Sequence, residues 1–325
     1  MQTIIVDEKK SNIKIEKYLQ EIYPDLSFGN LQKAFRKKDI KVNGIRVGRD
    51  YLIKRGDKLE IYIADEFLHA TGIPGDTRMD SNKAFHVVYE DDNILLVNKE
   101  QGIPVHPDRG QSKNTLIDLV REYVRGKNES MAGGSYFQPA LCHRLDRNTG
   151  GLVIIAKNQA SLDIMLDKLE SREVIKYYQC LVKGKMEKPE AVLKAYLWKD
   201  ASKSRVFVSN QKTIGSLEII TGYKVIKYNP EMDISLLEVE LVTGRTHQIR
   251  AHLAFIGHPV IGDGKYGTNA INRFFGLKQQ ALWACKLRFR FSGQNTLLSY
   301  LNGREFNVDA GFDIGQFAPQ RNKHE

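Results

Sequence analysis

The densest polar cluster in the chain surrounds a single aspartate, Asp146. Residues 142–151 read Cys-His-Arg-Leu-Asp-Arg-Asn-Thr-Gly-Gly, and they precede an apolar run, Leu-Val-Ile-Ile-Ala, at 152–156. A loop held against a buried strand is a common place for catalytic groups, and an aspartate there can act as a nucleophile or a general base. The local sequence by itself favours a plainer role, in which Asp146 pairs with Arg144 or Arg147 or caps a turn.

A second polar cluster, Thr-Gly-Arg-Thr-His-Gln-Ile-Arg-Ala-His, occupies residues 243–252 after a predicted strand. Arg245 precedes a predicted helix and Arg250 falls within its first turns. A helix N-terminus attracts anions, so these two arginines suit a carboxylate or a phosphate. His247 and His252 are five residues apart, which does not place them on one helical face as two metal-binding histidines would be. We therefore expect no metal site.

Two further segments carry polar or aromatic residues without a clear chemical signature. Tyr177 and Tyr178 lie in a predicted strand, where neighbouring side chains point to opposite faces. Such tyrosines usually pack against other side chains, although one of them could stack on a base. Residues 257–267 are rich in glycine but lack the spacing of a phosphate-binding loop, and we interpret them as a structural turn.

The elements that must position these clusters are predicted to be mainly strands. Apolar patterning predicts strands at 87–89, 94–97, 152–156, 177–182 and 234–241, and helices at 115–124 and 159–171. The second of these helices would bury Leu162, Met165, Leu166 and Leu169 on one face. Strands outnumber helices and do not alternate regularly with them, which favours an α+β fold over a doubly wound sheet.

The N-terminal segment predicts a small helix-helix-hairpin module. One helix starts at Ile15 and ends before Pro24, and a second follows Ser27 and ends in Arg36-Lys37-Lys38. Asn43-Gly44 between two short β runs indicates a hairpin, and Arg55-Gly56-Asp57 indicates a turn before a strand at 58–63. Residues 11–60 hold twelve Lys and Arg against seven Asp and Glu, 12 − 7 = +5. This is half of the chain's net charge of +10, and it suggests a phosphate-binding face, although charge runs are more often simply solvated.

The composition points to a cytosolic protein with a polyanionic partner. The length of 325 residues suggests two domains, and a pI near 9.3 favours nucleic acid or an anionic membrane. No apolar run is long enough to cross a membrane, and the first ten residues lack the long apolar run of a signal peptide, so we expect a cytoplasmic protein without a membrane partner. The three cysteines, Cys142, Cys180 and Cys285, form no CxxC pair and are expected to be free thiols.

The order of these motifs resembles the RluA-type pseudouridine synthases. The matching motifs span about residues 86–290 and, in chain order, read Tyr-Glu-Asp-Asp at 89–92, Val-Asn-Lys at 97–99, Gly-Ile-Pro-Val-His-Pro at 102–107, His-Arg-Leu-Asp-Arg at 143–147, residues 176–184, Gly-Arg-Thr-His-Gln-Ile-Arg at 244–250, and residues 258–267. The resemblance implies that the second polar cluster and the segment with Tyr177 and Tyr178 belong to one site around Asp146.

The resemblance implies an enzyme that turns uridine into pseudouridine in structured RNA, most of all in the RNA of the large ribosomal subunit. It implies a mixed, mainly antiparallel sheet, a monomer, and no metal or other cofactor. Asp146 would be the catalytic aspartate, Arg250 would pair with it, and Tyr178 would stack on the uracil. Arg144 would fill the space left by the flipped nucleotide, while His143, Arg147 and Arg245 would position RNA or neighbouring loops. An inactive RNA-binding or ribosome-assembly factor of the same fold is the alternative.

The N-terminal module resembles an S4 RNA-binding domain over residues 11–63. This resemblance implies an RNA-binding domain at 1–63. Residues 64–84 carry Gly72, Pro74 and Gly75 without a clear period and predict a linker, so the catalytic domain is expected at 85–325. The residues expected to contact RNA through the module are Lys33, Arg36, Lys37, Lys41 and Arg46.

The chain also departs from the family patterns at four places. Phe28 replaces a frequent basic residue of the S4 domain. In the second domain Lys-Glu replaces Lys-Pro at 99–100, Thr-Gly-Gly replaces Thr-Ser-Gly at 149–151, and Leu-Trp-Ala replaces Leu-His-Ala at 282–284. None of these departures touches Asp146, Tyr178 or Arg250.

Overall fold

The chain forms two compact units, residues 1–78 and 79–325. The computed structural model describes residues 2–6, 11–23, 28–37, 39–62, 84–107, 114–128, 137–200, 205–277, 279–293 and 296–315. The predicted linker at 64–84 lies outside the described residues except for Ala84. Three residues expected to delimit the two N-terminal helices, Pro24, Ser27 and Lys38, also lie outside them.

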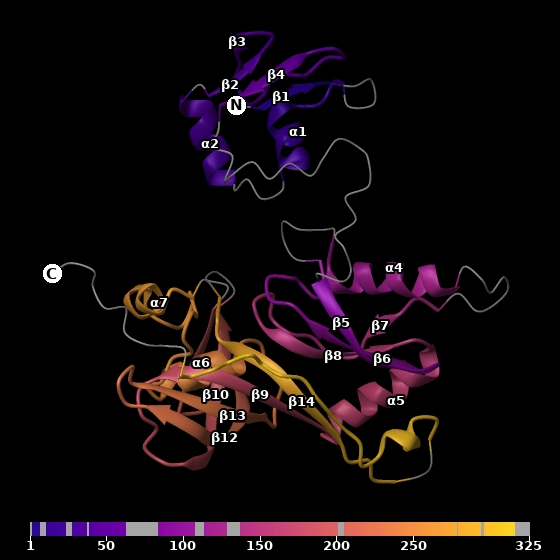
Figure 1. The fold of residues 1–325 in the computed structure, drawn as a ribbon, viewed down its shortest axis with the longest axis vertical. Coiled ribbons are helices and arrows are strands. Elements are labelled where there is room, and N and C mark those ends of the chain that lie inside the picture. The colour runs from indigo at the N-terminus through magenta and orange to yellow at the C-terminus, as the bar shows by residue number, and fades with distance from the viewer. Residues whose placement is uncertain are drawn as a thin grey trace. The chain divides into compact units, whose positions relative to one another are not determined.

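The N-terminal unit packs two helices against a four-stranded antiparallel sheet (Figure 1). Its elements are β1 (Gln2–Ile5), α1 (Ile15–Ile22), α2 (Phe28–Lys37), β2 (Ile40–Val42), β3 (Ile45–Arg46) and β4 (Lys58–Ile61), with the sheet order β1-β4-β2-β3. Ile15, Leu19 and Leu31 from the helices are fully buried with Ile40 and Leu59 from the sheet. The predicted helices and hairpin are confirmed, and the last strand ends at Ile61 rather than at residue 63.

The hairpin turn shows why the Asn-Gly pair is needed. Asn43 and Gly44 both adopt left-handed backbone conformations, with φ of 52° and 79°, which match the twist of a two-residue hairpin. The Asn43 amide also donates to the Asp57 carboxylate at 2.8 Å, and its Oδ1 accepts from the Lys58 N–H at 2.8 Å. One side chain thus joins the hairpin to the turn that starts β4.

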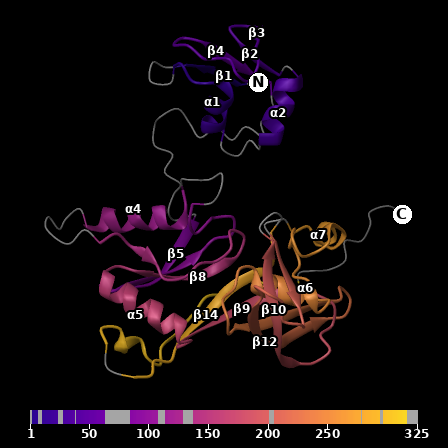
Figure 2. The same cartoon turned by 180° about the vertical axis from the view of Figure 1, so that it is seen from behind.

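The second unit is built on one large, mainly antiparallel sheet (Figures 1 and 2). Among the described residues it has eleven strands, whose main path runs β11-β10-β12-β13-β9-β14-β8-β6-β5. The strands are β5 (Phe85–Glu90), β6 (Ile94–Lys99), β7 (Ala140–Leu141), β8 (Gly150–Ala156), β9 (Val174–Lys183), β10 (Glu190–Asp200), β11 (Arg205–Ser209), β12 (Leu217–Asn229), β13 (Ile234–Leu241), β14 (Leu282–Phe289) and β15 (Glu305–Asn307); the helices are α4 (Leu116–Asn128), α5 (Gln159–Glu170), α6 (Gln248–Phe255), α7 (Asn269–Phe275) and a short 3-10 helix at Ser299–Leu301. The predicted α+β fold is confirmed.

Helices cover both faces of the sheet half that carries the first polar cluster. Every residue of β8 is buried, and alternate side chains face α4 on one side and α5 on the other, as Figures 1 and 2 show for the helices. This explains why the strand is apolar throughout rather than alternating. In α5, Met165 is buried but Leu166 is 44% exposed. The prediction that Leu166 belongs to the buried face is therefore wrong, because a helix resting on a sheet buries a narrower stripe than its apolar residues cover.

The two halves of the sheet meet at a short parallel pairing. β8 pairs with β14 only through Trp283 opposite Gly150 and Ala284 opposite Gly151, while the other strand pairs in this sheet are antiparallel. We refer to this pairing as the seam. In the part of the chain that the structure describes, no helix is long and apolar enough to cross a membrane.

Candidate active site

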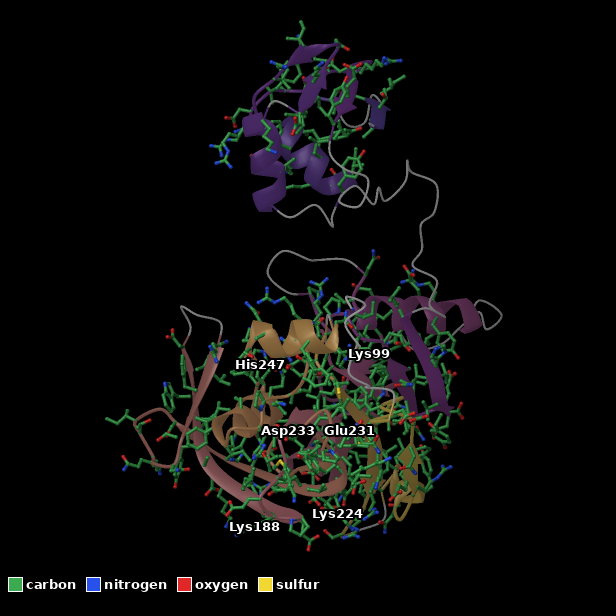
Figure 3. All side chains as sticks on the ribbon, turned by 60° about the vertical axis from the view of Figure 1, so that its left-hand side comes forward. Lys99, Lys188, Lys224, Glu231, Asp233 and His247 are labelled. Atoms are coloured by element: carbon green, nitrogen blue, oxygen red, sulfur yellow. The ribbon has the colours of Figure 1, made fainter. Side chains whose placement is uncertain are left out.

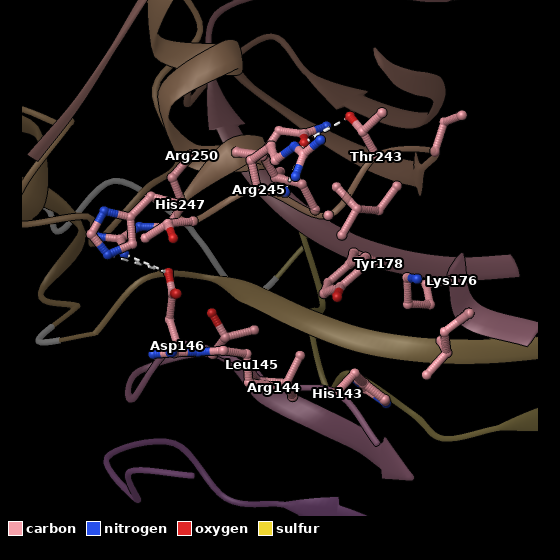
Figure 4. Close-up of a pocket in the computed structure, with 18 of the residues that line it drawn as sticks. His143, Arg144, Leu145, Asp146, Lys176, Tyr178, Thr243, Arg245, His247 and Arg250 are labelled. Carbon is pink, nitrogen blue, oxygen red and sulfur yellow. Dashed lines mark hydrogen bonds and ion pairs between the residues drawn. The ribbon is translucent and has the colours of Figure 1, made fainter. Parts of the chain in front are cut away.

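A pocket of about 550 Å³ opens beside the seam and brings the two polar clusters together. One wall is the loop between β7 and β8, residues 142–149. The opposite wall is the segment 241–250, which leads from the end of β13 into α6. Tyr178 and Lys176 of β9 line it between these walls, as Figure 4 shows. Segments that are distant in the sequence therefore share one cavity.

Asp146 points from its loop toward the start of α6 (Figure 4). Its Oδ2 accepts a hydrogen bond from Nη1 of Arg250 at 2.7 Å, and the Nε2 atom of His247 lies 3.9 Å from the same oxygen. The Asp146 side chain is 24% exposed, so the carboxylate is open to the pocket. The expected pairing of Asp146 with a neighbouring arginine of its own loop does not occur, because a cation from across the sheet occupies that oxygen.

The other side of Arg250 is held by a carboxylate that the sequence did not single out. Asp263 accepts from Nε of Arg250 at 2.6 Å and from Nη2 at 2.9 Å, and its side chain is fully buried. Backbone N–H groups of Lys265 and Tyr266 donate to Asp263 at 2.8 and 3.0 Å. Burial alone would raise the pKa of Asp263, but the guanidinium and the two N–H groups outweigh it and lower that pKa. The segment 257–267, expected to be only a structural turn, thus supplies the anchor of Arg250.

Tyr178, rather than Tyr177, faces the pocket. Tyr178 is 5% exposed and lines the cavity with Asp146. Burial raises the pKa of the Tyr178 phenol, and the nearby Asp146 carboxylate adds to the increase, so the hydroxyl stays protonated across the ordinary pH range. Tyr177 points to the opposite face, where its ring packs beneath Lys286 and Arg288 at 4.6 and 5.4 Å.

A buried lysine holds the Asp146 loop through a hydrogen bond to its backbone. Lys99, at the end of β6, is fully buried, and its Nζ donates to the carbonyls of Glu100 and Ile103 at 2.9 Å and of Arg147 at 3.1 Å. Burial lowers the pKa of Lys99 to about 7, while the Asp146 carboxylate opposes this by favouring the charged form. The sequence pattern contained Lys99 but offered no signal for this role, because the Arg147 carbonyl comes from a distant loop that only the fold brings to Lys99.

The remaining predicted residues of this unit divide between the pocket and its supports. Arg144 and Arg245 are exposed and line the cavity. His143 accepts from the Ile154 N–H through Nε2 at 3.1 Å, and burial lowers its pKa to about 3, so it is a neutral tether of the loop to β8. Arg147 is exposed and donates to the Gly102 carbonyl at 2.9 Å, which ties the loop to the segment after β6.

Sequence reasoning missed two cations of the pocket. Arg172, just after α5, and Lys176, in β9, line the cavity together with Arg144, Arg245 and Arg250. Lys176 is half-buried, and burial lowers its pKa. Arg172 has a left-handed backbone with φ of 62°, a turn that nothing in the local sequence signals.

The pocket walls carry two acidic side chains, Asp146 and Glu170, against these five cations, so the pocket attracts anionic ligands. Within the described residues no three His, Cys, Asp or Glu side chains are arranged to hold a metal ion.

Comparison with known proteins decides the family. A family model described as RNA pseudouridylate synthase matches residues 93–255 of this chain. The chain belongs to this family. It is an RNA pseudouridine synthase, and therefore an isomerase.

Two relatives show how far the likeness extends. An uncharacterized RNA pseudouridine synthase of Aquifex aeolicus is 32% identical over 256 residues, covering 78% of this chain and 77% of that protein. Ribosomal large subunit pseudouridine synthase C of Rickettsia felis is 31% identical over 306 residues, covering 91% of this chain and 92% of that relative. The second match includes most of both chains.

Solved structures show the same fold. Human RNA pseudouridylate synthase domain containing 1 aligns with a TM-score of 0.52 and 22% identity, covering 75% of this chain and 95% of that one. Human RNA pseudouridylate synthase domain containing 4 aligns with a TM-score of 0.53 and 19% identity, covering 70% of this chain and 88% of that one. The large mixed sheet of this synthase is therefore the fold of the family.

Two of the departures from the family pattern meet at the seam of this synthase. A Cβ atom on Gly150 would lie 2.3 Å from the ring of Trp283. With Trp283 in place, there is therefore no room for a side chain at position 150. The ring cannot simply turn away, because its Nε1 donates to Oδ1 of Asn98 at 3.1 Å. The two departures, glycine for the serine and tryptophan for the histidine of the family pattern, are thus coupled by packing at the seam.

We expect Gly150→Ser to destabilise the enzyme by about 1–3 kcal/mol, the usual cost of overfilling a packed site. Trp283→His should also destabilise it, because the smaller ring leaves space over Gly150. The double variant should lose less stability than the sum of the two single losses, since the serine then occupies the space that the tryptophan leaves. Thermal or urea unfolding of the four proteins measures this coupling, and additive losses would contradict the pairing.

Proposed function

We propose that this synthase isomerises specific uridines in large-subunit ribosomal RNA, with Asp146 as its catalytic carboxylate. One observation carries the assignment of Asp146: it is the carboxylate that the pocket presents to a ligand while Arg250 holds one of its oxygens. The ribosomal substrate is supported by relatives named ribosomal large subunit pseudouridine synthase C, at 31% and 32% identity. No feature of the described residues favours the alternative of an inactive RNA-binding factor.

The proposed reaction breaks the bond between N1 of uracil and C1′ of the ribose, turns the base, and joins C5 to C1′. The proton that leaves C5 balances the proton that N1 gains, so no redox partner is required. Arg250 places its guanidinium against Oδ2 of Asp146 at 2.7 Å. The carboxylate can attack the sugar or take a proton from it. Tyr178 lines the pocket where the uracil would lie, and its neutral phenol suits stacking on the base.

The cations of the pocket suit an RNA from which one nucleotide is flipped out. Flipping costs a few kcal/mol in lost stacking and pairing, and contacts with the phosphates and with the emptied position can offset that cost. Arg144 and Arg245 are exposed at the walls of the pocket, where they can reach the RNA. Arg144 is proposed to fill the space that the flipped nucleotide leaves in the RNA. Arg172 and Lys176 extend the cationic surface along the pocket.

The N-terminal unit is proposed to hold the RNA as an S4-like domain. Arg36 and Lys37 are exposed at the end of α2, where cations also complement the helix dipole. Lys41 and Arg46 face each other across the β2–β3 hairpin, so both side chains lie on one face of it. The Lys33 side chain, also expected to bind RNA, lies outside the described residues. Arg36, Lys37 and Arg46 are exposed and Lys41 is half-buried, and such cations suit contacts with phosphates rather than with base edges.

We expect Lys41→Ala combined with Arg46→Ala to weaken RNA binding similarly for all sequences. Each lost phosphate contact should lower the slope of log affinity against log salt by about one. The measurement is a salt titration of RNA binding by the full chain. Lys224→Ala is the matched control: Lys224 is exposed on β12 and, in Figure 3, lies well away from His247. An unchanged slope in the double variant would contradict the proposed role of this hairpin.

The proposed function is tested by mapping pseudouridines in defined transcripts. The purified full chain is incubated with unmodified large-subunit ribosomal RNA, small-subunit ribosomal RNA and transfer RNA, and pseudouridines are then mapped in each. We expect discrete sites in the large-subunit RNA alone. Sites found only in the other RNAs would overturn the substrate, and no product in any of them, free or in ribosomal particles, would favour the binding-factor alternative.

A further inference from the structure

A chain of three polar contacts leads from a backbone amide to the carboxylate of Asp146. The Val206 N–H, in β11, donates to the Tyr266 hydroxyl oxygen at 3.0 Å. The same hydroxyl lies 2.9 Å from Nδ1 of His247. Nε2 of His247 in turn lies 3.9 Å from Oδ2 of Asp146, and Figure 4 shows the imidazole beside that carboxylate.

The chemistry of these groups orients the protons. A backbone N–H can only donate, so the Tyr266 oxygen is the acceptor for Val206. Among the contacts of the described residues, Nδ1 of His247 is the only acceptor within reach of the Tyr266 hydroxyl proton. If Tyr266 donates to Nδ1, the proton of a neutral imidazole must be on Nε2, which faces Asp146. The negative charge of Asp146 favours the same tautomer, because the alternative would turn a lone pair toward a carboxylate.

The imidazole is also neutral at ordinary pH. Burial is the main cause that lowers the pKa of His247; the Arg250 and Lys265 charges also lower it, the Asp146 and Asp263 charges raise it, and the resulting pKa is about 4. The backbone of His247 is unusual as well. Its φ is 53°, in the left-handed region, although it precedes α6 without any side-chain cap to the helix. A non-glycine residue held in that region costs about 1 kcal/mol or more, which suggests that the position of the ring matters.

We propose that His247 is a positioning residue for the reaction. Tyr266 holds its imidazole in the Nε2–H tautomer, and that N–H faces the same Oδ2 that Arg250 binds. At 3.9 Å the N–H acts through its dipole rather than through a hydrogen bond. Two donors on one side of the carboxylate leave Oδ1, for which the described residues provide no hydrogen bond, as the oxygen that meets the substrate. The inference rests on the proposed role of Asp146 in catalysis.

The tautomer is tested directly by NMR of the full chain labelled with ¹⁵N-histidine. The His247 signals are assigned by their loss in His247→Gln. We expect a neutral ring protonated on Nε2 at pH 7 and still neutral at pH 5. Tyr266→Phe should shift the ring toward the Nδ1–H tautomer, while unfolding curves establish that the variant is folded. An Nδ1–H tautomer or an imidazolium in the wild-type protein at pH 7 would overturn the proposal.

Kinetics test whether the tautomer matters. We expect His247→Ala to lower kcat by about tenfold, the effect of one lost polar contact to a charged group, with little change in KM. His247→Gln, which keeps an N–H donor, should restore most of the loss. His86→Gln, at an exposed histidine in β5, is the control for a lost imidazole. Wild-type kcat in both His247 variants would overturn the proposal. If the wild-type protein makes no pseudouridine, the proposed function fails, while the NMR result still tests the tautomer.

Discussion

Asp146→Asn is expected to abolish pseudouridine formation while leaving RNA binding largely intact. Asparagine has nearly the same shape but no negative charge, so it can neither attack the sugar nor take a proton from it. In a well-studied hydrolase, losing a group that performs the chemistry lowers turnover by on the order of 10⁴-fold or more. The fold should hold, because Arg250 keeps both of its bonds to Asp263. Product formation and RNA affinity are measured on the same preparation.

A matched substitution separates the loss of catalysis from the loss of a charge. Asp163→Asn removes one carboxylate from the exposed face of α5, where its oxygen accepts from Gln159 at 2.7 Å and asparagine can accept as well. This variant should retain wild-type activity and binding. Near wild-type turnover in Asp146→Asn would show that the carboxylate has no chemical role, and the assignment of this site would then be wrong.

Arg250→Met is expected to cause the second largest effect, on both stability and activity. The substitution leaves Asp263 buried without its cation, and breaking a buried ion pair in this way costs about 3–5 kcal/mol. Asp146 also loses its partner at 2.7 Å, so turnover should fall together with stability. Urea unfolding and pseudouridine formation measure the two effects separately.

A second substitution should divide these two effects. In Arg250→Met combined with Asp263→Asn, no charge is left buried, so we expect most of the stability to return. Activity should not return, because Asp146 still lacks its cation. If activity recovered along with stability, Arg250 would act only through the fold, and its proposed role beside Asp146 would be lost.

The effect of Arg250→Met on stability should also depend on pH. In the wild-type enzyme the pKa of Asp263 is below its ordinary value, so its bonds stabilise the fold above the unfolded-state pKa and are lost as pH falls through the folded one. Without Arg250, burial dominates and the folded-state pKa of Asp263 rises. The variant is then penalised at neutral pH, and the penalty shrinks as the carboxyl protonates. The stability gap between the two proteins should therefore narrow between pH 7 and pH 4.

Much of the fold could be predicted because its signals are local. The Asn-Gly hairpin, the wholly apolar β8 and the helical spacing of α4 and α5 each depend on a few neighbouring residues. The prediction for Leu166 was wrong because the width of a buried stripe depends on what packs against the helix. Local sequence could not show that β8 and β14 run in parallel, since two residue pairs 133 positions apart make that contact.

Some residues of the site could be predicted and others could not, because several of their contacts are not local in sequence. The resemblance singled out Asp146, Tyr178 and Arg250, and the structure places all three at one pocket; their roles remain proposals. Asp263 was missed because a carboxylate within a glycine-rich turn is locally indistinguishable from one that ends a loop. Tyr266 was missed because its partners, Val206 and His247, come from other segments, and Lys99 was missed because its contact with the Asp146 loop is made by the distant Arg147 carbonyl. Hydrogen-bond partners that are far apart in the sequence can be identified only once the pairing of the strands is known.

The seam between β8 and β14 also bears on how the enzyme folds. Residues 84–170 can form one half of the sheet and residues 174–289 the other, because the strands of each half pair with one another. The backbone pairing between the halves consists of two residue pairs that are each 133 positions apart, and contacts so distant in sequence tend to form late. Because Asp146 lies on one half and Arg250 on the other, the carboxylate meets its cation only in that last step. A nascent or partly folded chain would thus lack an assembled pocket, and exposure to RNA before folding is complete would not produce misplaced modification.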